Sequence, residues 1–353
     1  MLEFLLLLSM VSTSLGEFAT SSVDGLPIHY RQWSPSESAP VAILYVVHGM
    51  AEHAGRYEDF ALELVDKLGI SVVAHDQRAH GLTACPPDGP ESSCSSLGVL
   101  ERRPGAERMD AVTLMALDGL SVISHTNLHT LPVFLFGHSM GSVVARAMIR
   151  HANDSVRNLI SGTVLSGVPT PPGGIDPYIF PAIGYGIKRV GGFGHEFVQK
   201  NFITRKFDLA LARKLNLKKH FEENFFISSQ PSAVQAYNAD PLSGHLVDVD
   251  ILLSVASTLA NLQNPADFLA LPPTAVYPFL FIAGRDDPVC SFGHTAAIDA
   301  ANLAALGHAV SEVYLSNCRH EFINEAPAVR SLGIDQVASW VFHQLERETS
   351  IEF

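Results

Sequence analysis

Residues 137–141, GHSMG, place Ser139 between two glycines, after the apolar stretch VFLF and before a run of small residues. Glycine-x-serine-x-glycine between a buried strand and a helix is typical of a nucleophile elbow, a strained turn that presents the serine hydroxyl at the end of a sheet. A tight structural turn is the alternative. The apolar stretch favours the elbow, and we therefore expect Ser139 to be a nucleophile.

A serine hydroxyl becomes a good nucleophile when a base removes its proton and an acid orients that base. After a nucleophile elbow, the acid and the histidine follow the serine along the chain. Asp286 and Asp287 come after the apolar stretch FLFIAG, and His320 comes after EVYL. Of the sixteen histidines, His320 best combines chain order with a place after an apolar stretch. We expect it to be the base rather than a surface histidine, and either aspartate to be the acid.

Acyl transfer also requires backbone N–H groups that stabilise the oxyanion. Met140 follows the serine directly and supplies one of them. The loop HGMAEHAGRY follows the first apolar stretch, and its first two residues allow a close turn that would offer the N–H of Met50. This loop has neither the glycine pattern of a dinucleotide site nor the lysine of a phosphate-binding loop. The sequence therefore predicts a hydrolase that uses no cofactor and no metal.

Apolar stretches that are typical of buried parallel strands alternate with helix-like stretches. The predicted strands span 41–47, 70–74, 132–136, 160–166, 277–283 and 312–315. The predicted helices span 57–68, 107–124, 140–151, 294–306 and 326–346. This alternation predicts an α/β fold with a mostly parallel, doubly wound sheet whose site lies at the carboxyl ends of the strands.

Residues 170–231 interrupt the alternation between the fourth and fifth predicted strands. They begin with glycine, proline and aromatic residues and continue with a basic amphipathic stretch. We interpret them as a cap inserted over the strand ends, with the two parts of the hydrolase core at 17–169 and 232–353. A disordered linker is the alternative, but the aromatic content argues against it.

The overall composition excludes several classes of protein. The chain has 353 residues, of which 47% are hydrophobic and 17% charged, so a large core is expected rather than disorder. A net charge of −13 argues against a nucleic-acid partner, because phosphate binding needs a basic face. No apolar run reaches the roughly 18 residues of a membrane-spanning helix.

The N-terminal residues 1–16 are apolar and end in small residues, so we set them apart from the fold as a cleaved signal peptide. The usual basic residue is missing, and a membrane-surface anchor or a simple extension are the alternatives. Cys85 and Cys94 bracket a turn-rich loop that a disulfide would close in an oxidising compartment, although two free thiols are also consistent with it. A secreted or membrane-associated location is favoured, and a cytoplasmic one stays open.

Several motifs, in order along the chain, resemble those of the monoacylglycerol lipase family of the α/β-hydrolases. HGMAEHAGRY resembles the family's HGxxEHxxRY loop, and VVAHDQRAHGLT its DxxGHGxS stretch. PVFLFGHSMG resembles its nucleophile elbow, QAYNADPL the segment after its cap, and AGRDDPVC and SNCRHEFINE its acid and histidine loops. The resemblance runs from about Phe18 to the C-terminus and is weakest in the cap.

The resemblance assigns roles to individual residues. It implies Asp287 rather than Asp286 as the acid, because the family's acid sits third after a glycine. It also implies that Cys290 would make the enzyme sensitive to thiol reagents. The other implied residues are Ser139 as nucleophile, His320 as base, Met50 and Met140 in the oxyanion hole, and Glu52, Arg56 and His138 around the glycerol head group.

One departure from the family concerns backbone geometry. Ala79 stands where the family has a glycine, in DQRAHG. If this position needs a positive φ angle, an alanine there carries a steric penalty. The N-terminal segment and the loop with Cys85 also differ from the animal lipases, which leaves substrate preference and location open.

These observations predict a serine hydrolase that cleaves the ester of monoacylglycerols, or of related single-chain lipids, through an acyl-enzyme. The cap aromatics Tyr178, Phe180 and Tyr185 would line an apolar channel and dock transiently on membranes, with ordinary packing as the alternative. Other readings are a lysophospholipase or carboxylesterase, and a proline-iminopeptidase-like peptidase in which Glu52 holds the substrate amine. A catalytically inactive hydrolase fold used for binding is the non-enzymatic alternative. The oligomeric state is left open.

Overall fold

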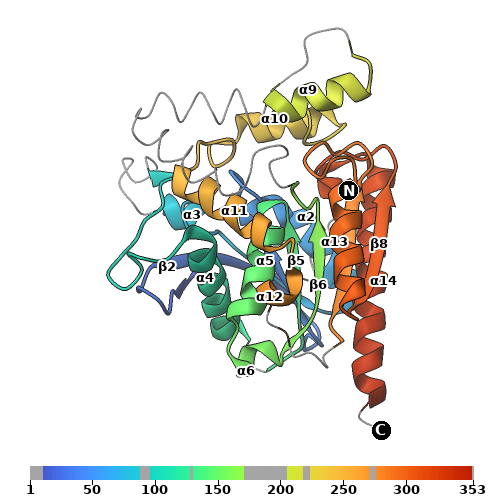
Figure 1. Ribbon diagram of the computed structural model, residues 1–353. Coiled ribbons are helices and arrows are strands. Elements are labelled where there is room, and N and C mark those ends of the chain that lie inside the picture. Colours follow the sequence, from blue (N-terminus) through green and yellow to red (C-terminus); the bar gives the residue numbers. More distant parts are fainter. Residues whose placement is uncertain are drawn as a thin grey trace.

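The computed structural model describes residues 11–87, 96–127, 130–170, 205–217, 223–269, 271 and 276–351. Within these residues eight strands form one sheet in the order β1-β2-β4-β3-β5-β6-β7-β8 (Figure 1). Neighbours from β4 to β8 are parallel, whereas β2 is antiparallel to both β1 and β4. The strands are β1 (Val11–Thr20), β2 (Pro27–Pro35), β3 (Ile43–Val47), β4 (Ser71–His75), β5 (Val133–His138), β6 (Ile160–Ser166), β7 (Pro278–Gly284) and β8 (Ala309–Leu315).

The six parallel strands confirm the predicted doubly wound sheet, and each overlaps a predicted apolar stretch. The antiparallel pair β1 and β2 was not predicted. Its strands lie at the edge of the sheet, and β2 mixes buried with partly exposed residues, so neither reads as a continuous apolar run. Residues 11–16, predicted to lie outside the fold, belong to β1: residues 11–14 pair with β2, and residues 15 and 16 lie in an irregularity of the pairing. Residues 1–10 lie outside the described residues.

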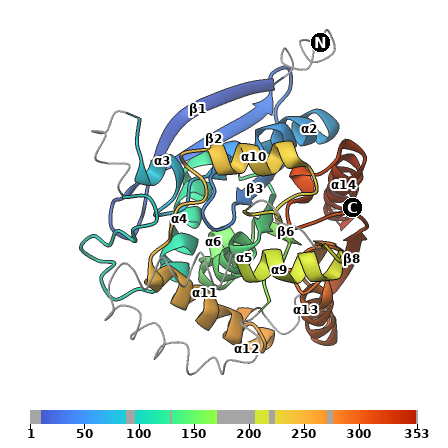
Figure 2. The ribbon, with the colours of Figure 1, turned by 90° about the horizontal axis from the view of Figure 1, so that it is seen from above.

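Helices cover both faces of the sheet (Figure 2). Successive strand residues point to opposite faces, and because both sets are apolar, each face must be buried against helices. Leu44 and Val46 of β3 face the core that contains α2 and α14. Tyr45 and Val47 face the larger core formed with α4, α5, α11 and α13. The main helices are α2 (Glu58–Leu68), α4 (Ala111–Thr126), α5 (Met140–His151), α11 (Val249–Asn261), α13 (His294–Ala305) and α14 (Pro327–Ile351). The shorter ones are η1 (Ala54–Tyr57), α3 (Gly81–Ala84), α6 (Asp154–Arg157), α12 (Pro265–Leu269) and η4 (Phe322–Asn324).

The inserted region between β6 and β7 is described in part. Helices α9 (Arg205–Lys214) and α10 (Pro231–Ala239) lie at one end of the sheet, while α11 and α12 run beside α5 (Figure 1). Tyr178, Phe180 and Tyr185 lie outside the described residues, so their predicted place in an apolar channel stays a prediction. Across the described part of the chain, no helix combines the length and apolarity needed to cross a bilayer.

Ala79 has a φ angle of 71°, in the left-handed region that glycine adopts without cost. The neighbouring Arg78 helps to hold this turn. Its guanidinium is fully buried and donates to Asp24, at 2.7 Å, and to Asp118, at 2.9 Å. The turn after β4 is thus fixed by a buried ion triad despite an alanine in a strained position.

We expect Ala79→Gly to raise the free energy of unfolding by up to about 1 kcal/mol, because relief of left-handed strain exceeds the added flexibility of the unfolded chain. The control is Ala74→Gly in β4, which should instead lower it by about 1–2 kcal/mol through lost burial and strand entropy. Urea unfolding of the three proteins measures both changes. Equal destabilisation by the two glycines would contradict the strain at residue 79.

Candidate active site

Ser139 connects β5 to α5 in a backbone conformation that few side chains adopt, with φ 52° and ψ −122°. The flanking glycines are required by close packing. A Cβ on Gly137 would lie 2.5 Å from the Gly141 carbonyl oxygen, and one on Gly141 would lie 2.0 Å from the carbonyl oxygen of Val47. Ser139 is partly accessible, whereas both glycines are buried. The chain therefore turns sharply here and leaves the serine open to solvent.

Two backbone N–H groups lie next to this turn. Met140 is the first residue of α5, and Met50 belongs to the loop after β3. That loop lies against the elbow, since a Cβ on Gly49 would be 3.2 Å from the Ser139 Cβ. In the described part of the chain, neither the Met50 nor the Met140 N–H has a hydrogen-bond acceptor. Both N–H groups are therefore available to an oxygen bound near Ser139.

His320 and Asp287 form a buried pair at the ends of the last two strands. Their Nδ1 and Oδ2 atoms are 2.9 Å apart, and the Val289 N–H donates to the other carboxylate oxygen at 2.8 Å. Burial lowers the pKa of His320, but the charge and hydrogen bond of Asp287 outweigh it and leave the pKa raised. The ring lies 4.6 Å from that of His138, the residue before Ser139. The structure thus brings the predicted base to the elbow with its tautomer set by a carboxylate.

The two neighbouring aspartates have different partners. Asp286 forms an ion pair with Lys214 of α9 at 2.9 Å, and it is partly exposed. The same ammonium group donates to the Arg285 carbonyl and lies 4.4 Å from the centre of the Phe292 ring. Of the two, therefore, Asp287 faces the histidine, while Asp286 fastens the inserted region to the core.

Glu52 and Arg56 form a buried charge cluster with Glu321. Arg56 donates to Glu52 at 2.6 Å and to both carboxylate oxygens of Glu321 at 2.8 and 2.7 Å. Glu52 also accepts from the Gly49 N–H at 2.5 Å and from the Tyr57 hydroxyl at 2.9 Å. Burial raises the pKa of Glu52, but Arg56 and nearby histidines lower it to about 2. The carboxylate is thus charged and fully engaged, and it holds the loop that carries Met50.

His138 is buried, and its Nδ1 lies 3.3 Å from the Ser166 hydroxyl. Burial and the neighbouring His320 lower the pKa of His138 to about 4. The structure therefore places a neutral imidazole beside the base. Direct contact of Glu52, Arg56 or His138 with a substrate stays a prediction.

The segment after α9 supports the same loop in a way that the residue pattern alone did not predict. The Tyr237 hydroxyl and the Gly244 N–H both donate to the Ala51 carbonyl, at 3.0 and 2.9 Å. Ala51 has a positive φ of 55°. His53 is hydrogen-bonded to Asp240 at 2.7 Å. Within the sequence, only the family-like stretch QAYNADPL indicated that this segment matters, and it did not predict these contacts.

The cysteines separate into two kinds. Cys85 is disulfide-bonded, and Cys94 lies outside the described residues. Cys290 and Cys318 are free thiols, and both are buried. Burial and the Asp287 carboxylate raise the pKa of Cys290 well above its usual range, so little thiolate is present at neutral pH. This environment disfavours the reactivity toward thiol reagents that the resemblance implied.

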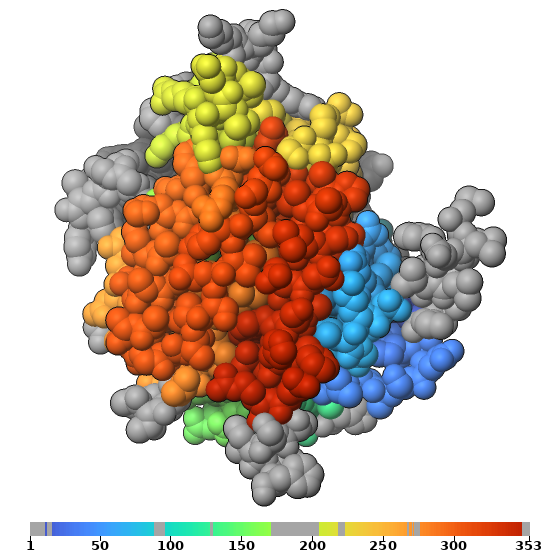
Figure 3. All heavy atoms as spheres, turned by 90° about the vertical axis from the view of Figure 1, so that its right-hand side faces the viewer, coloured from blue at the N-terminus to red at the C-terminus, as the bar shows by residue number. Residues whose placement is uncertain are grey.

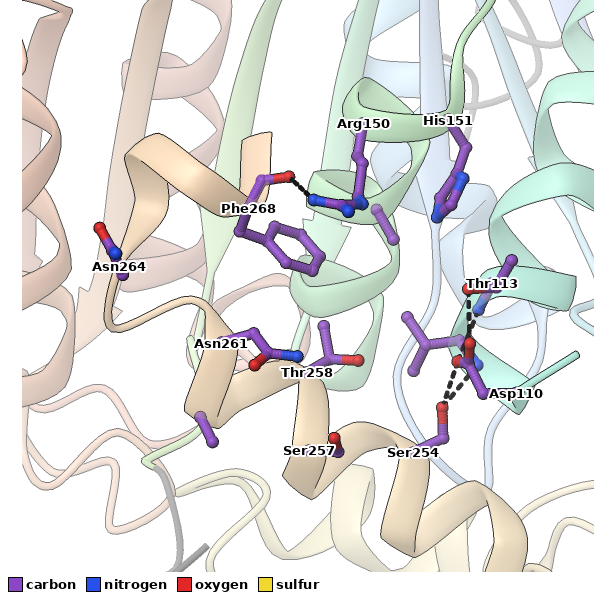
Figure 4. Close-up of a pocket in the computed structure, with 13 residues that line it drawn as sticks. Asp110, Thr113, Arg150, His151, Ser254, Ser257, Thr258, Asn261, Asn264 and Phe268 are labelled. Carbon is purple, nitrogen blue, oxygen red and sulfur yellow. Dashed lines mark hydrogen bonds between the residues drawn. The ribbon is translucent and has the colours of Figure 1, made fainter. Parts of the chain in front are cut away.

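A cavity of about 700 Å³ lies at the far end of α5 from the serine (Figure 4). Because a helix rises about 1.5 Å per residue, the two ends of α5 are about 17 Å apart. The cavity therefore does not contain the groups described above. It is lined by Asp110, Val112, Thr113, Ala147, Arg150, His151, Ser254, Ser257, Thr258, Ala260, Asn261, Asn264 and Phe268. Among the described residues, no cluster of histidine, cysteine and carboxylate side chains has the arrangement of a metal site.

The profile of the family described as serine aminopeptidase, S33 (Hydrolase_4) matches residues 38–327, most of the chain. This chain belongs to the S33 serine aminopeptidase family. The match spans the elbow, both aspartates and His320, so this α/β-hydrolase family covers the whole site.

Curated relatives match over nearly their full lengths. The monoglyceride lipase of Rattus norvegicus is 25% identical over 327 residues, which cover 92% of this chain and 89% of that protein. The monoacylglycerol lipase of Mycolicibacterium smegmatis is 25% identical over 350 residues, which cover 95% of this chain and 100% of that protein. These similarities support a lipase or esterase of the carboxylic ester hydrolase class.

Solved structures share the fold of this family member. A thermostable carboxyl esterase from Bacillus coagulans, in complex with glycerol, has a TM-score of 0.71 at 22% identity and covers 95% of this chain and 99% of its own. A soluble variant of the monoglyceride lipase from Saccharomyces cerevisiae has a TM-score of 0.62 at 17% identity and covers 94% of this chain and 97% of its own. Both likenesses establish the α/β-hydrolase fold.

The different partners of the two aspartates lead to a direct prediction. Asp287→Asn should lower kcat for ester hydrolysis by about 10³–10⁴-fold, because an amide no longer holds the imidazole in the required tautomer. Asp286→Asn removes only a partly exposed ion pair and should change kcat no more than a few-fold. Steady-state kinetics on a soluble ester measures both. A larger loss in Asp286→Asn would show that the wrong aspartate has been assigned.

Proposed function

We propose that this protein is a serine hydrolase that cleaves monoacylglycerols to fatty acid and glycerol. The observation that carries the proposal is the His320–Asp287 pair beside the elbow serine, together with the N–H groups of Met50 and Met140, which find no acceptor among the described residues. The curated relatives that match over most of this chain are monoglyceride or monoacylglycerol lipases, which supports a single-chain lipid ester as the substrate.

In the proposed mechanism, His320 takes the Ser139 proton as the hydroxyl oxygen attacks the ester carbonyl. Asp287 keeps the imidazole oriented through Nδ1 and stabilises the imidazolium. The N–H groups of Met50 and Met140 bind the oxygen that becomes negative. His320 then protonates the leaving glycerol oxygen, and a water molecule releases the fatty acid by the reverse sequence.

The charge cluster favours an ester over a peptide substrate. An enzyme that removes N-terminal residues needs an acidic group to hold the substrate ammonium, and Glu52 was the candidate. Its carboxylate is 3% exposed and already bound to Arg56, Tyr57 and Gly49. Binding an amine there would break a buried ion pair, which costs about 3–5 kcal/mol.

The exposed side of α9 supports transient contact with a membrane. Arg205, Lys206 and Arg213 are exposed on this helix, together with Leu209. Basic and apolar groups on one short surface are typical of helices that lie at the lipid interface. Such contact would bring the site to a substrate that resides in membranes. Lysophospholipids and simple carboxylic esters are the nearest alternative substrates.

Fatty-acid release from a 2-monoacylglycerol tests the proposal. The purified protein should turn the lipid over, and Ser139→Ala should reduce the rate by about 10⁴-fold or more because the covalent intermediate no longer forms. The control substrate is an amide of N-terminal proline, which a proline iminopeptidase would cleave. This protein should not cleave it. A folded protein that cleaves the amide but not the lipid would overturn the proposal in favour of a peptidase.

A further inference from the structure

Asp208 of α9 is a buried carboxylate that the mechanism does not use. It is 3% exposed, and its two oxygens accept the Phe226 N–H at 2.9 Å and the Asn224 N–H at 3.2 Å. Burial raises its pKa to about 6, although the two backbone N–H groups act in the opposite direction. A buried carboxylate costs free energy unless hydrogen bonds compensate for it, and the two bonds of Asp208 tie α9 to residues 224 and 226.

Residues 224–228, here called the bridging segment, continue from Asp208 to the loop of the base. The His320 N–H donates to the Phe226 carbonyl at 3.2 Å, and the Glu321 N–H donates to the Ile227 carbonyl at 2.9 Å. The Phe226 ring also lies 5.8 Å from the His320 ring. The bridging segment is therefore hydrogen-bonded to the backbone that carries the base.

Arg319 fastens the same two segments a second time. Its guanidinium donates to the Phe225 and Ser228 carbonyls at 2.7 and 2.6 Å, and it lies 3.7 Å from the centre of the Phe225 ring. These bonds join the bridging segment and the His320 loop into one hydrogen-bonded unit. In Figure 3, α9 (yellow-green) rests directly on the orange and red C-terminal part of the surface. Helix α9 holds that unit through the two hydrogen bonds of Asp208, and the Phe207 ring of the same helix lies 5.4 Å from the Phe226 ring.

We propose that Asp208 is a positioning residue, which makes the alignment of His320 depend on the place of α9. The side chain of His320 is held at Nδ1 by Asp287, and its backbone is held by Phe226. A shift of the bridging segment therefore changes the direction in which the imidazole points toward Ser139. The inference rests on the proposed function, in which His320 is the general base.

Asp208→Asn is the test variant, because asparagine keeps the size of the side chain but has one acceptor oxygen instead of two. Glu223→Gln is the matched control. Glu223 is exposed, and it acts on Asp208 through its charge alone, without a hydrogen bond. The nearby Arg319 also acts on Asp208 through its charge. Asp208→Glu keeps both acceptors and serves as the conservative variant, also in case the asparagine variant does not fold.

Two readouts are needed, kcat and KM on a soluble ester, and the low-field ¹H NMR resonance of the proton between His320 and Asp287. Asp208→Asn should lower kcat on the order of tenfold with little change in KM, since misplacement of a catalytic group acts on the chemical step. It should also shift or broaden the resonance. Asp208→Glu should have a kcat and a resonance closer to those of the wild type than Asp208→Asn has. Glu223→Gln should match the wild type in both.

An unchanged resonance and kcat in Asp208→Asn would overturn the inference, as would an effect on KM alone or an equal effect of Glu223→Gln. The resonance needs no substrate. If the wild type hydrolyses no ester, the proposed function fails, while the resonance still decides whether Asp208 positions the histidine.

Discussion

The backbone of Ser139 is held in an unfavourable conformation by the close approach of α5 to the sheet. Gly141 packs so tightly on the carbonyl of Val47 that no side chain fits, and Gly137 packs equally closely on α5. The helix axis, the end of β5 and the loop after β3 are therefore fixed relative to one another. The close packing of these two glycines thus sets the exposure of the serine and holds the loop that carries Met50 beside it.

Buried charges stabilise the loops around this turn. Arg56 joins Glu52, in the loop that carries Met50, to Glu321, the residue after His320, although 265 positions separate Arg56 from Glu321. Arg78 joins the turn after β4 to α4 through Asp118. Buried ion pairs add little net stability, but removal of one partner is costly, so they specify which loops lie together. Here the pairs of Arg56 make the loop that carries Met50 and the loop that carries His320 parts of one arrangement.

The sequence alone predicted the parts of the fold in which nearly every residue of a strand is buried. Strands β3 to β7 are almost entirely buried and read as apolar runs, whereas β8, at the edge of the sheet, exposes Ser311 and Glu312 and was predicted only over 312–315. Helices α2, α4, α5, α13 and α14 were predicted between the strands, but α11 was not. β1 and β2 were missed because β1 lies at the edge of the sheet and β2, between β1 and β4, mixes buried and partly exposed residues. The elbow was predicted because its glycines are required locally.

The rest of the site depends on contacts between distant segments, which a residue pattern does not contain. Nothing local distinguishes Asp287 from Asp286, and the resemblance to a family was needed to prefer one of them. The engagement of Glu52 by Arg56, and of Asp208 by the bridging segment, is visible only when the chain is folded. The burial of Cys290, which disfavours the reactivity expected from its place in a motif, is likewise visible only in the folded chain.

The central claim is that the turn at residue 139 and the base at residue 320 produce an activated serine. Intact-protein and peptide mass spectrometry after brief exposure to a fluorophosphonate, which reacts with activated serine hydroxyls, tests it most directly. The account predicts one adduct per chain, on the peptide that contains Ser139, and much slower labelling in His320→Ala. A folded protein that gains no adduct, or gains it on another residue, would contradict the account.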